Sequence, residues 1–227
     1  MKEQVQVSKA VIKRLPKYRR YLEELKKKGL DRISSGEFSK LIGYTASQIR
    51  QDLNNFGGFG QQGYGYNVDS LYKQIGIILG IDHDYGIVIV GSGNLGQAIA
   101  NYMHNYGAGF SVLAMFDIKP DVVGRRVNEL VISDFGELGA YLAEHTADIG
   151  VITTGAASAQ NAADKLVAGG VKGIWNFAPV DLQVPRRIAL ENVHLSDSLH
   201  SLIYYINRSH PSNSAPSKFE RGAHPNC

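Results

Sequence analysis

Cysteine is nearly absent from this sequence: among 227 residues only Cys227, at the last position, is one. A disulfide framework and a cysteine-rich metal centre are therefore excluded, and we predict no metal site. No apolar run approaches the roughly 20 residues that a membrane-spanning helix requires. The first residues also lack the apolar core of a secretory signal. We therefore expect a cytoplasmic protein with no membrane partner.

Acidic side chains are sparse only in the first third of the chain. Residues 1–66 carry 13 Lys and Arg against 6 Asp and Glu, whereas residues 67–227 carry 11 against 15. A basic segment joined to an acidic one favours a polyanionic partner, and the partner that we predict is double-stranded DNA. A single basic run, such as residues 26–28, is more often a solvated face.

The basic segment has the pattern of three helices. Apolar residues recur at spacings of three and four from Ser8, Gly29 ends that pattern as a C-cap, and Pro16 predicts a break or kink inside it. Two adjacent serines can cap a short helix over residues 36–42, and after a glycine turn a third helix is predicted over residues 46–54. This order is the helix-turn-helix pattern, whose second helix enters the major groove of DNA.

Glycines alternate with aromatic and amide side chains over residues 55–66. This pattern predicts the β-hairpin wing of a winged helix, and a flexible aromatic loop is the alternative. Polar side chains of the third helix can hydrogen-bond base edges, and basic side chains can meet phosphates. The predicted DNA-contacting residues are Lys13, Arg14, Lys17, Arg20, Ser47, Gln48, Arg50, Gln51, Asn54, Gln61 and Gln62.

An unbroken apolar strand over residues 86–90 runs directly into a glycine fingerprint. There Gly91 makes the tight turn, Gly93 lets the backbone approach a pyrophosphate, and Gly96 lets the next helix pack against the strand. The residues predicted to hold a dinucleotide here are Gly91, Ser92, Gly93, Asn94, Leu95 and Gly96. Strand, loop and helix in this order are the context that such a fingerprint requires, and a sheet that binds no nucleotide is the alternative.

A second strand, over residues 111–116, ends at Asp117, which lies 21 residues after Gly96. An acidic residue at this point bonds ribose hydroxyls and disfavours a 2′-phosphate, so we predict NAD(H) as the cofactor rather than NADP(H). Lys119 argues in the other direction, because a cation two residues later can meet a 2′-phosphate.

Two later strands are predicted over residues 148–152 and 173–177. Loops at the carboxyl ends of parallel strands line the ligand crevice of such a sheet. We therefore expect Thr153, Thr154 and Asn176 beside the nicotinamide half of the cofactor, with ordinary loop capping as the alternative. A last helix over residues 197–206 is very apolar, which favours a helix shared between two subunits.

These motifs together resemble one family, the bacterial redox-sensing transcriptional repressors called Rex, from about Ser8 to Arg208. The most specific matching stretches are residues 14–18, 45–53, 56–60, 91–96 and 175–179. The resemblance implies a homodimer whose last helix is exchanged between subunits, and repression of genes for fermentation and NADH reoxidation. It also implies that the NAD⁺ or free form binds a palindromic operator, and that NADH closes the dimer and moves the heads out of register with the DNA.

The predicted fold class is α/β, with an N-terminal winged helix-turn-helix domain followed by a Rossmann domain, a doubly wound parallel sheet, and a C-terminal swapped helix. The predicted boundaries are 1–80 for the DNA-binding domain with a linker helix, 81–196 for the NAD(H)-binding domain, 197–208 for the exchanged helix and 209–227 for a disordered tail.

Three positions depart from the family pattern. Many members have a basic residue where Gln51 stands, an Arg where Gln62 stands, and an Asp where His194 stands. In the family that Asp couples the nicotinamide state to dimer closure, near a Tyr that matches Tyr102. The resemblance therefore adds Tyr102 and His194 to the predicted cofactor site, with a passive surface histidine as the alternative for His194.

Two other classes of protein remain as alternatives. An NAD-dependent oxidoreductase with an appended basic domain would need a general acid or base and a substrate pocket. No Tyr-x-x-x-Lys pair follows the fingerprint at dehydrogenase spacing, and a body of roughly 130 residues leaves little room for a substrate domain. A nucleotide-gated channel module gives no reason for a basic winged head. We therefore predict a regulator without enzymatic activity.

Overall fold

The structure is a computed structural model, and it describes residues 7–61, 64–106 and 109–209. It divides into two units, and the boundary along the chain lies between Asp84 and Tyr85. The first unit holds the predicted DNA-contacting residues and the second holds the glycine fingerprint, and each is described by itself. Gln62 and residues 210–227 of the predicted tail lie outside the described residues.

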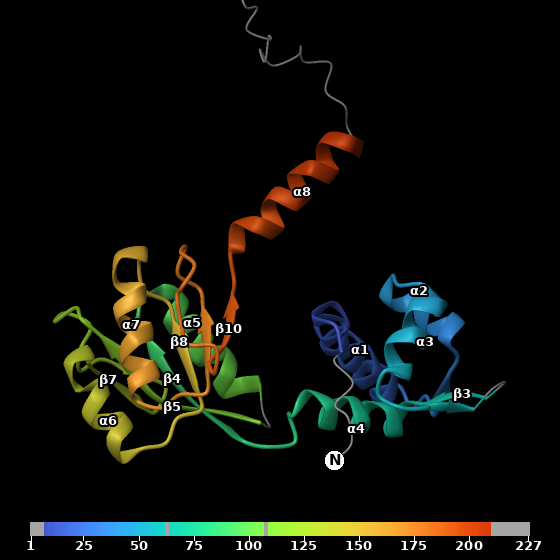
Figure 1. The fold of residues 1–227 in the computed structure, drawn as a ribbon, viewed down its shortest axis with the longest axis horizontal. Helices are drawn as coiled ribbons and strands as arrows, with labels where there is room; N and C mark the ends of the chain where they lie inside the picture. The colour runs from blue at the N-terminus through green and yellow to red at the C-terminus, as the bar shows by residue number, and fades with distance from the viewer. Residues whose placement is uncertain (1–6, 62–63, 107–108, 210–227) are drawn as a thin grey trace, which may run out of the picture. The chain divides into compact units, whose positions relative to one another are not determined.

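The first unit, which we call the head, combines helices with a small antiparallel sheet (Figure 1). Its elements are α1 (Lys9–Lys27), β1 (Arg32–Ile33), α2 (Ser35–Ile42), α3 (Ala46–Asn54), β2 (Gly60–Gln61), β3 (Gly65–Asn67) and α4 (Val68–Leu79). The strand order is β1-β3-β2, and β2 pairs with β3 as the predicted wing hairpin. The helix-turn-helix and the wing are therefore confirmed.

Local sequence signals set the helix ends in the head. The Thr45 hydroxyl accepts the N–H of Gln48 at the start of α3. At the start of α2, Ser34 and Glu37 form a capping box in which each side chain accepts the other residue's backbone N–H. Gly43 then ends α2 in the left-handed region, at a φ of 71°, which glycine adopts without steric cost.

Of the break or kink predicted at Pro16, the break was wrong, because α1 runs without interruption from Lys9 to Lys27, and the kink stays a prediction. Proline removes one backbone hydrogen bond from a helix interior. Here Leu15, Tyr18 and Leu22 on the same helix are fully buried, and their packing outweighs that loss. The helix ends at Lys27 with Lys28 as its C-cap, and Gly29, which was predicted to be the C-cap, follows one residue later with a φ of 71°.

One apolar core holds the head together. It is formed by fully buried side chains from the four helices, among them Leu15, Tyr18, Leu22, Phe38, Ile49, Leu53, Leu71 and Ile75. The second helix of the helix-turn-helix therefore has a fixed position against α1, which matters for the contacts described below.

The second unit, the body, is a seven-stranded sheet flanked by helices (Figure 1). Its elements are β4 (Tyr85–Val90), α5 (Asn94–Tyr106), β5 (Phe110–Asp117), β6 (Arg126–Val127), β7 (Leu130–Asp134), η1 (Phe135–Glu137), α6 (Leu138–Glu144), β8 (Ile149–Ile152), α7 (Ala156–Ala168), β9 (Gly173–Asn176), β10 (Ala189–Asn192) and α8 (Leu195–Ser209). The strand order is β10-β9-β8-β4-β5-β7-β6, and among the described strands of this sheet only β6 runs antiparallel to its neighbour. This is the predicted doubly wound order. From β4 the chain adds strands on one side of the sheet and then, from β8 on, adds them on the other side, so the winding reverses between β4 and β8.

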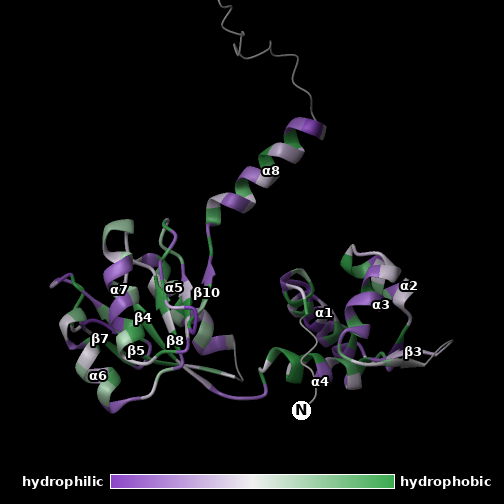
Figure 2. Cartoon of the chain, in the orientation of Figure 1, coloured by the Kyte–Doolittle hydropathy of each residue, from purple (hydrophilic) through white to green (hydrophobic). Residues whose placement is uncertain are grey.

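The two faces of the body sheet explain why β4 is apolar throughout. Val88 and Val90 pack with α6 and α7 on one face, whereas Ile87 and Ile89 pack with α5 on the other. Figure 2 shows these central strands as the apolar middle of the body. A strand covered on both faces needs apolar residues at every position rather than at alternate ones.

Helix α8 follows the sheet, and none of its described side chains is buried. Apolar and polar residues alternate around it (Figure 2), and its large exposed apolar residues are Leu195, Leu199, Leu202, Ile203, Tyr204, Tyr205 and Ile206. Among the described residues, no helix is both long enough and apolar enough to cross a membrane.

Candidate functional site

The turn between β4 and α5 has the backbone that a dinucleotide fingerprint requires. Gly91 has a φ of 101°, and a Cβ atom on Gly96 would collide with the carbonyl oxygen of Gly91. A Cβ on Gly93 would meet no atom within 4 Å, so this position faces open space. Two of the glycines are therefore needed for the turn itself, and the third leaves room for a ligand to reach the backbone.

Asp117 lies at the end of β5, beside this turn. Its carboxylate accepts the N–H of Ser92 at 2.5 Å and the N–H of Lys119 at 3.0 Å. The side chain is nearly buried, at 8% exposure, yet it lines the adjoining pocket. Each carboxylate oxygen can accept a second hydrogen bond, so the ring hydroxyls of a ribose remain suitable partners.

A pocket of about 250 Å³ lies where the sheet reverses its winding, above the carboxyl ends of β4, β5 and β8. Gly91 and Gly93 line it from one side, residues 117–119 from another, and Thr153 and Thr154 from a third. Thr153 also donates to the carbonyl oxygen of Gly91 at 2.7 Å, which ties the two loops together. Ligands of doubly wound sheets bind at this point.

A hydroxyl group at the pocket fits a polar ligand. Within the described residues, the Thr154 Oγ1 and the Ser92 Oγ are buried and have no hydrogen-bond partner. Thr154 lines the pocket, whereas the fully buried Ser92 does not. Buried hydroxyls without partners are costly, and a ligand that supplies donors and acceptors removes that cost. The amino end of α5 also points its free N–H groups toward the loop, which suits a phosphate.

Other predicted cofactor residues lie elsewhere. Asn176 is fully buried, and its side-chain amide donates to the carbonyl of Val180 at 2.7 Å and to the side chain of Asn192 at 2.9 Å. Leu95 packs in the apolar core under α5, and Asn94 is exposed at the first position of that helix. None of these three side chains lines the pocket.

Tyr102 and His194 are also away from the pocket within a single chain. Tyr102, on α5, is 57% exposed and lines a separate apolar hollow with Ile149 and Trp175. The His194 ring lies 3.3 Å from the carboxylate of Asp181, just before α8 begins.

The sequence interpretation missed several pocket residues. Ile118, Phe135, Ser158 and Ala162 line the pocket as well. Ser158 and Ala162 are four residues apart and therefore lie on one face of α7. This spacing of small side chains is the sequence pattern that could have indicated them as pocket residues. Phe135 lies in a segment for which no element was predicted.

In the head, the predicted base-reading residues share one face of α3. Ser47, Arg50, Gln51 and Asn54 are all exposed, and they recur at spacings of three and four. Arg50 donates to the Ser35 hydroxyl at 2.9 Å, which holds its side chain along α2. A polar, exposed helix face of this kind is suited to the edges of bases in a major groove.

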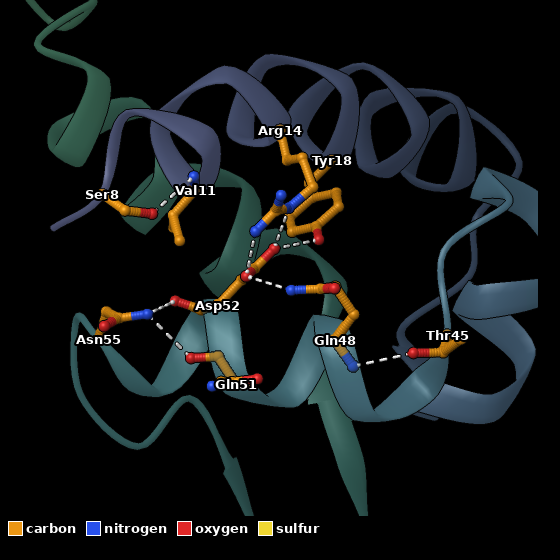
Figure 3. A network of polar contacts seen from close by, with 9 residues as sticks. All are labelled: Ser8, Val11, Arg14, Tyr18, Thr45, Gln48, Gln51, Asp52 and Asn55. Carbon is orange, nitrogen blue, oxygen red and sulfur yellow. Dashed lines mark hydrogen bonds and ion pairs between the residues drawn. The ribbon is translucent and has the colours of Figure 1, made fainter.

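The basic residues of α1 divide into two groups. Lys17 lies 4.9 Å from the ring of Tyr44, in the turn that leads into α3, and Lys13 and Arg20 are exposed on the same helix. Arg14 instead pairs with Asp52 of α3, with nitrogen to oxygen distances of 2.6 and 2.7 Å (Figure 3). The side chain of Gln61 is not among the described ones.

Asp52 is the centre of a buried polar network (Figure 3). Besides Arg14, it accepts hydrogen bonds from the Tyr18 hydroxyl at 2.6 Å and from the Gln48 amide at 3.2 Å. Burial raises the pKa of the Asp52 carboxyl, but the three donors outweigh burial and the net pKa lies below its ordinary value. Burial and then the bond to Asp52 raise the pKa of Tyr18. At neutral pH the carboxylate is therefore ionised and the phenol is protonated.

The head and the body together define a class: a helix-turn-helix DNA-binding unit followed by a Rossmann unit with a dinucleotide loop. Residues 6–54 match a family model described as the N-terminus of putative DNA-binding proteins, and residues 82–180 match one described as a CoA binding domain. A relative from Clostridium beijerinckii named redox-sensing transcriptional repressor Rex is 55% identical over 209 residues, 92% of this chain and 99% of the relative. The chain belongs to the Rex family of redox-sensing transcriptional repressors.

Two solved structures of a Rex-family repressor called RSP have the same fold. The complex of RSP with NAD⁺ and operator DNA is 52% identical, covers 90% of this chain and 94% of RSP, and has a TM-score of 0.84. The complex of RSP with NADH is 49% identical, covers 91% and 97%, and has the same TM-score. These relatives are named as repressors and not as enzymes, in line with the predicted absence of catalysis.

Proposed function

We propose that this chain represses transcription by binding a palindromic operator through its head, and that NADH in the body releases it. The protein then responds to the NADH/NAD⁺ ratio. One observation carries the proposal: an exposed polar α3 face and a polar pocket at the switch of a doubly wound sheet occur in one chain. RSP, which has this fold, binds operator DNA together with NAD⁺ and also binds NADH. The proposed place of action is the cytoplasm.

NAD(H) is the proposed ligand of the body. Gly93 admits the pyrophosphate to the backbone, Thr154 supplies an unpartnered hydroxyl, and Asp117 accepts ribose hydroxyls. A 2′-phosphate beside the Asp117 carboxylate would be repelled, and the nearby Lys119 only partly offsets that repulsion. This arrangement favours NAD(H) over NADP(H).

The redox switch is proposed to lie at the nicotinamide end of the site. NAD⁺ and NADH differ there by one positive charge and a puckered ring, whereas their adenosine halves are identical. A ligand shifts a conformational equilibrium only by its difference in affinity for the two states. Tyr102 and His194 are the proposed switch residues, and the buried Asn176 is proposed to act by holding the loop after β9.

A homodimer is the proposed assembly, with α8 exchanged between subunits. The helix buries none of its described side chains, although seven large apolar residues lie on it. The body also has apolar hollows over β8 and β9, and Ile149 and Trp175 line both of them. An apolar helix and an apolar hollow on one chain can cover each other in a symmetric pair, where each copy supplies both.

A titration tests this proposal. The full chain is first used to select a palindromic duplex from a random-sequence pool, and the labelled duplex is then titrated at fixed salt with NAD⁺ or NADH present. We expect tight binding with NAD⁺ or without nucleotide, and release by NADH. Equal binding at every NADH/NAD⁺ ratio would contradict the redox response, and failure to select any duplex would contradict operator binding.

A further inference from the structure

The buried carboxylate of Asp52 lies on the helix that is proposed to enter the major groove. Its side chain is 1% exposed, and its donors are Arg14, Tyr18 and Gln48. Arg14 and Tyr18 belong to α1, 38 and 34 residues earlier in the chain. The Oδ2 atom accepts from Arg14 and Tyr18, and the Oδ1 atom accepts from Arg14 and Gln48. Because both oxygens accept two hydrogen bonds, the position of the carboxylate is fixed.

This carboxylate determines which end of the Gln48 amide faces it. An ionised carboxylate only accepts hydrogen bonds, so Gln48 must turn its nitrogen toward Asp52, and the observed contact is Nε2 to Oδ1 at 3.2 Å. The amide of Gln48 keeps its oxygen and its second N–H for another partner. In an amide with no such neighbour, the two ends would exchange freely by rotation of the side chain.

Gln48 stands where a recognition helix meets bases. Thr45 caps α3, so Gln48 is its third residue, within the first turn. Its neighbour Ser47 and Gln51, one turn further on, belong to the exposed face, and the Gln48 side chain itself is partly exposed. The amino-terminal residues of a recognition helix are the ones that contact base edges.

The remaining groups of this amide match one base. Adenine offers an acceptor at N7 and a donor at N6 in the major groove, whereas guanine offers two acceptors. An amide that presents one oxygen and one N–H complements adenine, and its oxygen repels the O6 of guanine. We propose that Asp52, held by Arg14 and Tyr18, positions Gln48 to read an adenine in each half of the operator. This inference rests on the proposed function, because it assigns a base preference to the same helix.

Base-substitution binding measurements test the proposal. The selected palindrome is compared with duplexes in which each base pair of the half-site is changed in turn, for the full wild-type chain and for Gln48→Ala. One bidentate contact discriminates by about 5- to 150-fold. We expect Gln48→Ala to lose that discrimination at one A·T pair per half-site. Gln74→Ala, an exposed amide on α4 outside the predicted DNA-contacting residues, should keep it at that pair.

Asp52→Asn then separates positioning from general stability. An asparagine offers both donors and acceptors, so the Gln48 amide is no longer forced into one orientation, and preference at the same A·T pair should relax. In the Gln48→Ala background, Asp52→Asn should change that preference no further. A purely structural role predicts instead an equal loss of affinity for every duplex, with base preferences intact, and this result would overturn the proposal.

A triple variant guards against misfolding of Asp52→Asn. Replacing Arg14 by Met, Tyr18 by Phe and Asp52 by Leu removes the network without leaving a buried charge, an exchange that proteins often tolerate. Thermal unfolding establishes that the head is folded. The same A·T preference should relax, and an unchanged preference in this variant also overturns the proposal. If the wild-type chain selects no duplex, the proposed function fails instead.

Discussion

At the scale of single residues, Gly93 has the most direct consequence for ligand binding. The space beside it is empty, so Gly93→Val should fold normally while its methyl groups occupy the approach of the pyrophosphate. We expect NADH binding to be abolished and binding to the palindrome to stay intact, measured by NADH fluorescence and by duplex titration. Gly139→Ala, another position with open space but on α6, serves as the control. Retained NADH sensitivity in Gly93→Val would contradict the assigned site.

Arg50 is the corresponding residue in the head. Its guanidinium is exposed and donates to the Ser35 hydroxyl, so Arg50→Ala should cost little stability. We expect weaker operator binding, with the salt dependence reduced by about one phosphate contact or with preference lost at one guanine, and unchanged NADH affinity. Lys27→Ala, which removes a 72% exposed cation from α1, controls for total charge. A large loss of NADH affinity in Arg50→Ala would contradict the assignment of DNA binding to the head and NADH binding to the body.

At the scale of elements, α1 and α4 are joined by an acid-sensitive contact. Hydrogen bonds from Lys26 and then Lys73 lower the pKa of Asp69 from 3.8 to about 2. Because the folded pKa lies below the unfolded one, the contact contributes its stability above pH 3.8 and loses it as the pH falls toward about 2. Asp69→Asn should therefore show a smaller fall in the free energy of unfolding over that window than the wild-type chain, measured by urea unfolding at each pH. Parallel curves for the two proteins would refute this role.

Helix α1 also carries a proline that its packing overrides. Pro16 is exposed and lacks the N–H of an interior helix position. Pro16→Ala restores one backbone hydrogen-bond donor, which stabilises the helix, but it also increases the conformational entropy of the unfolded chain, which opposes folding. We expect a net stabilisation of about 1–2 kcal/mol, seen as a higher Tm. A lower Tm would contradict this expectation and would mean that the proline ring itself stabilises the local conformation of α1.

The elements that the sequence predicted well are those with local signals. The serine cap of α2, the Gly43 turn and Gly29 just after α1 each depend on residues within one turn of the chain. Strand β10 and the segment from β6 to α6 were not predicted, because β10 has an exposed, mixed pattern and pairs with β9 only through the sheet. The residues next to a strand in the sequence do not indicate which distant strand it pairs with.

The same distinction applies to the candidate site. Gly91, Gly93, Asp117 and Thr154 line the pocket, since strand ends and glycine spacing locate them, and their contact with NAD(H) stays a prediction. Asp52 was not predicted, although it determines the partners of Arg14, because the two are 38 residues apart and nothing nearby in the sequence relates them. Buried polar networks depend on tertiary packing, which periodicity alone does not reveal.

At the scale of the whole molecule, α8 provides a test of assembly. A chain that ends at His194 lacks α8, whereas a chain that ends at Ser209 keeps it. We expect the first to be a monomer and the second a dimer by light scattering. Loss of the second head should weaken binding to the palindrome by about 100-fold or more, since both half-sites no longer bind together. A dimer without α8 would show that the subunits associate through another surface.

The exposed apolar residues of α8 have one more consequence if a second copy covers them. Folding and pairing then become a single equilibrium, so thermal midpoints rise with protein concentration by mass action. The amount of this regulator in a cell would set how much of it is competent to hold a gene silent, independently of the nucleotide pool. Dilution alone would act as a second route to derepression.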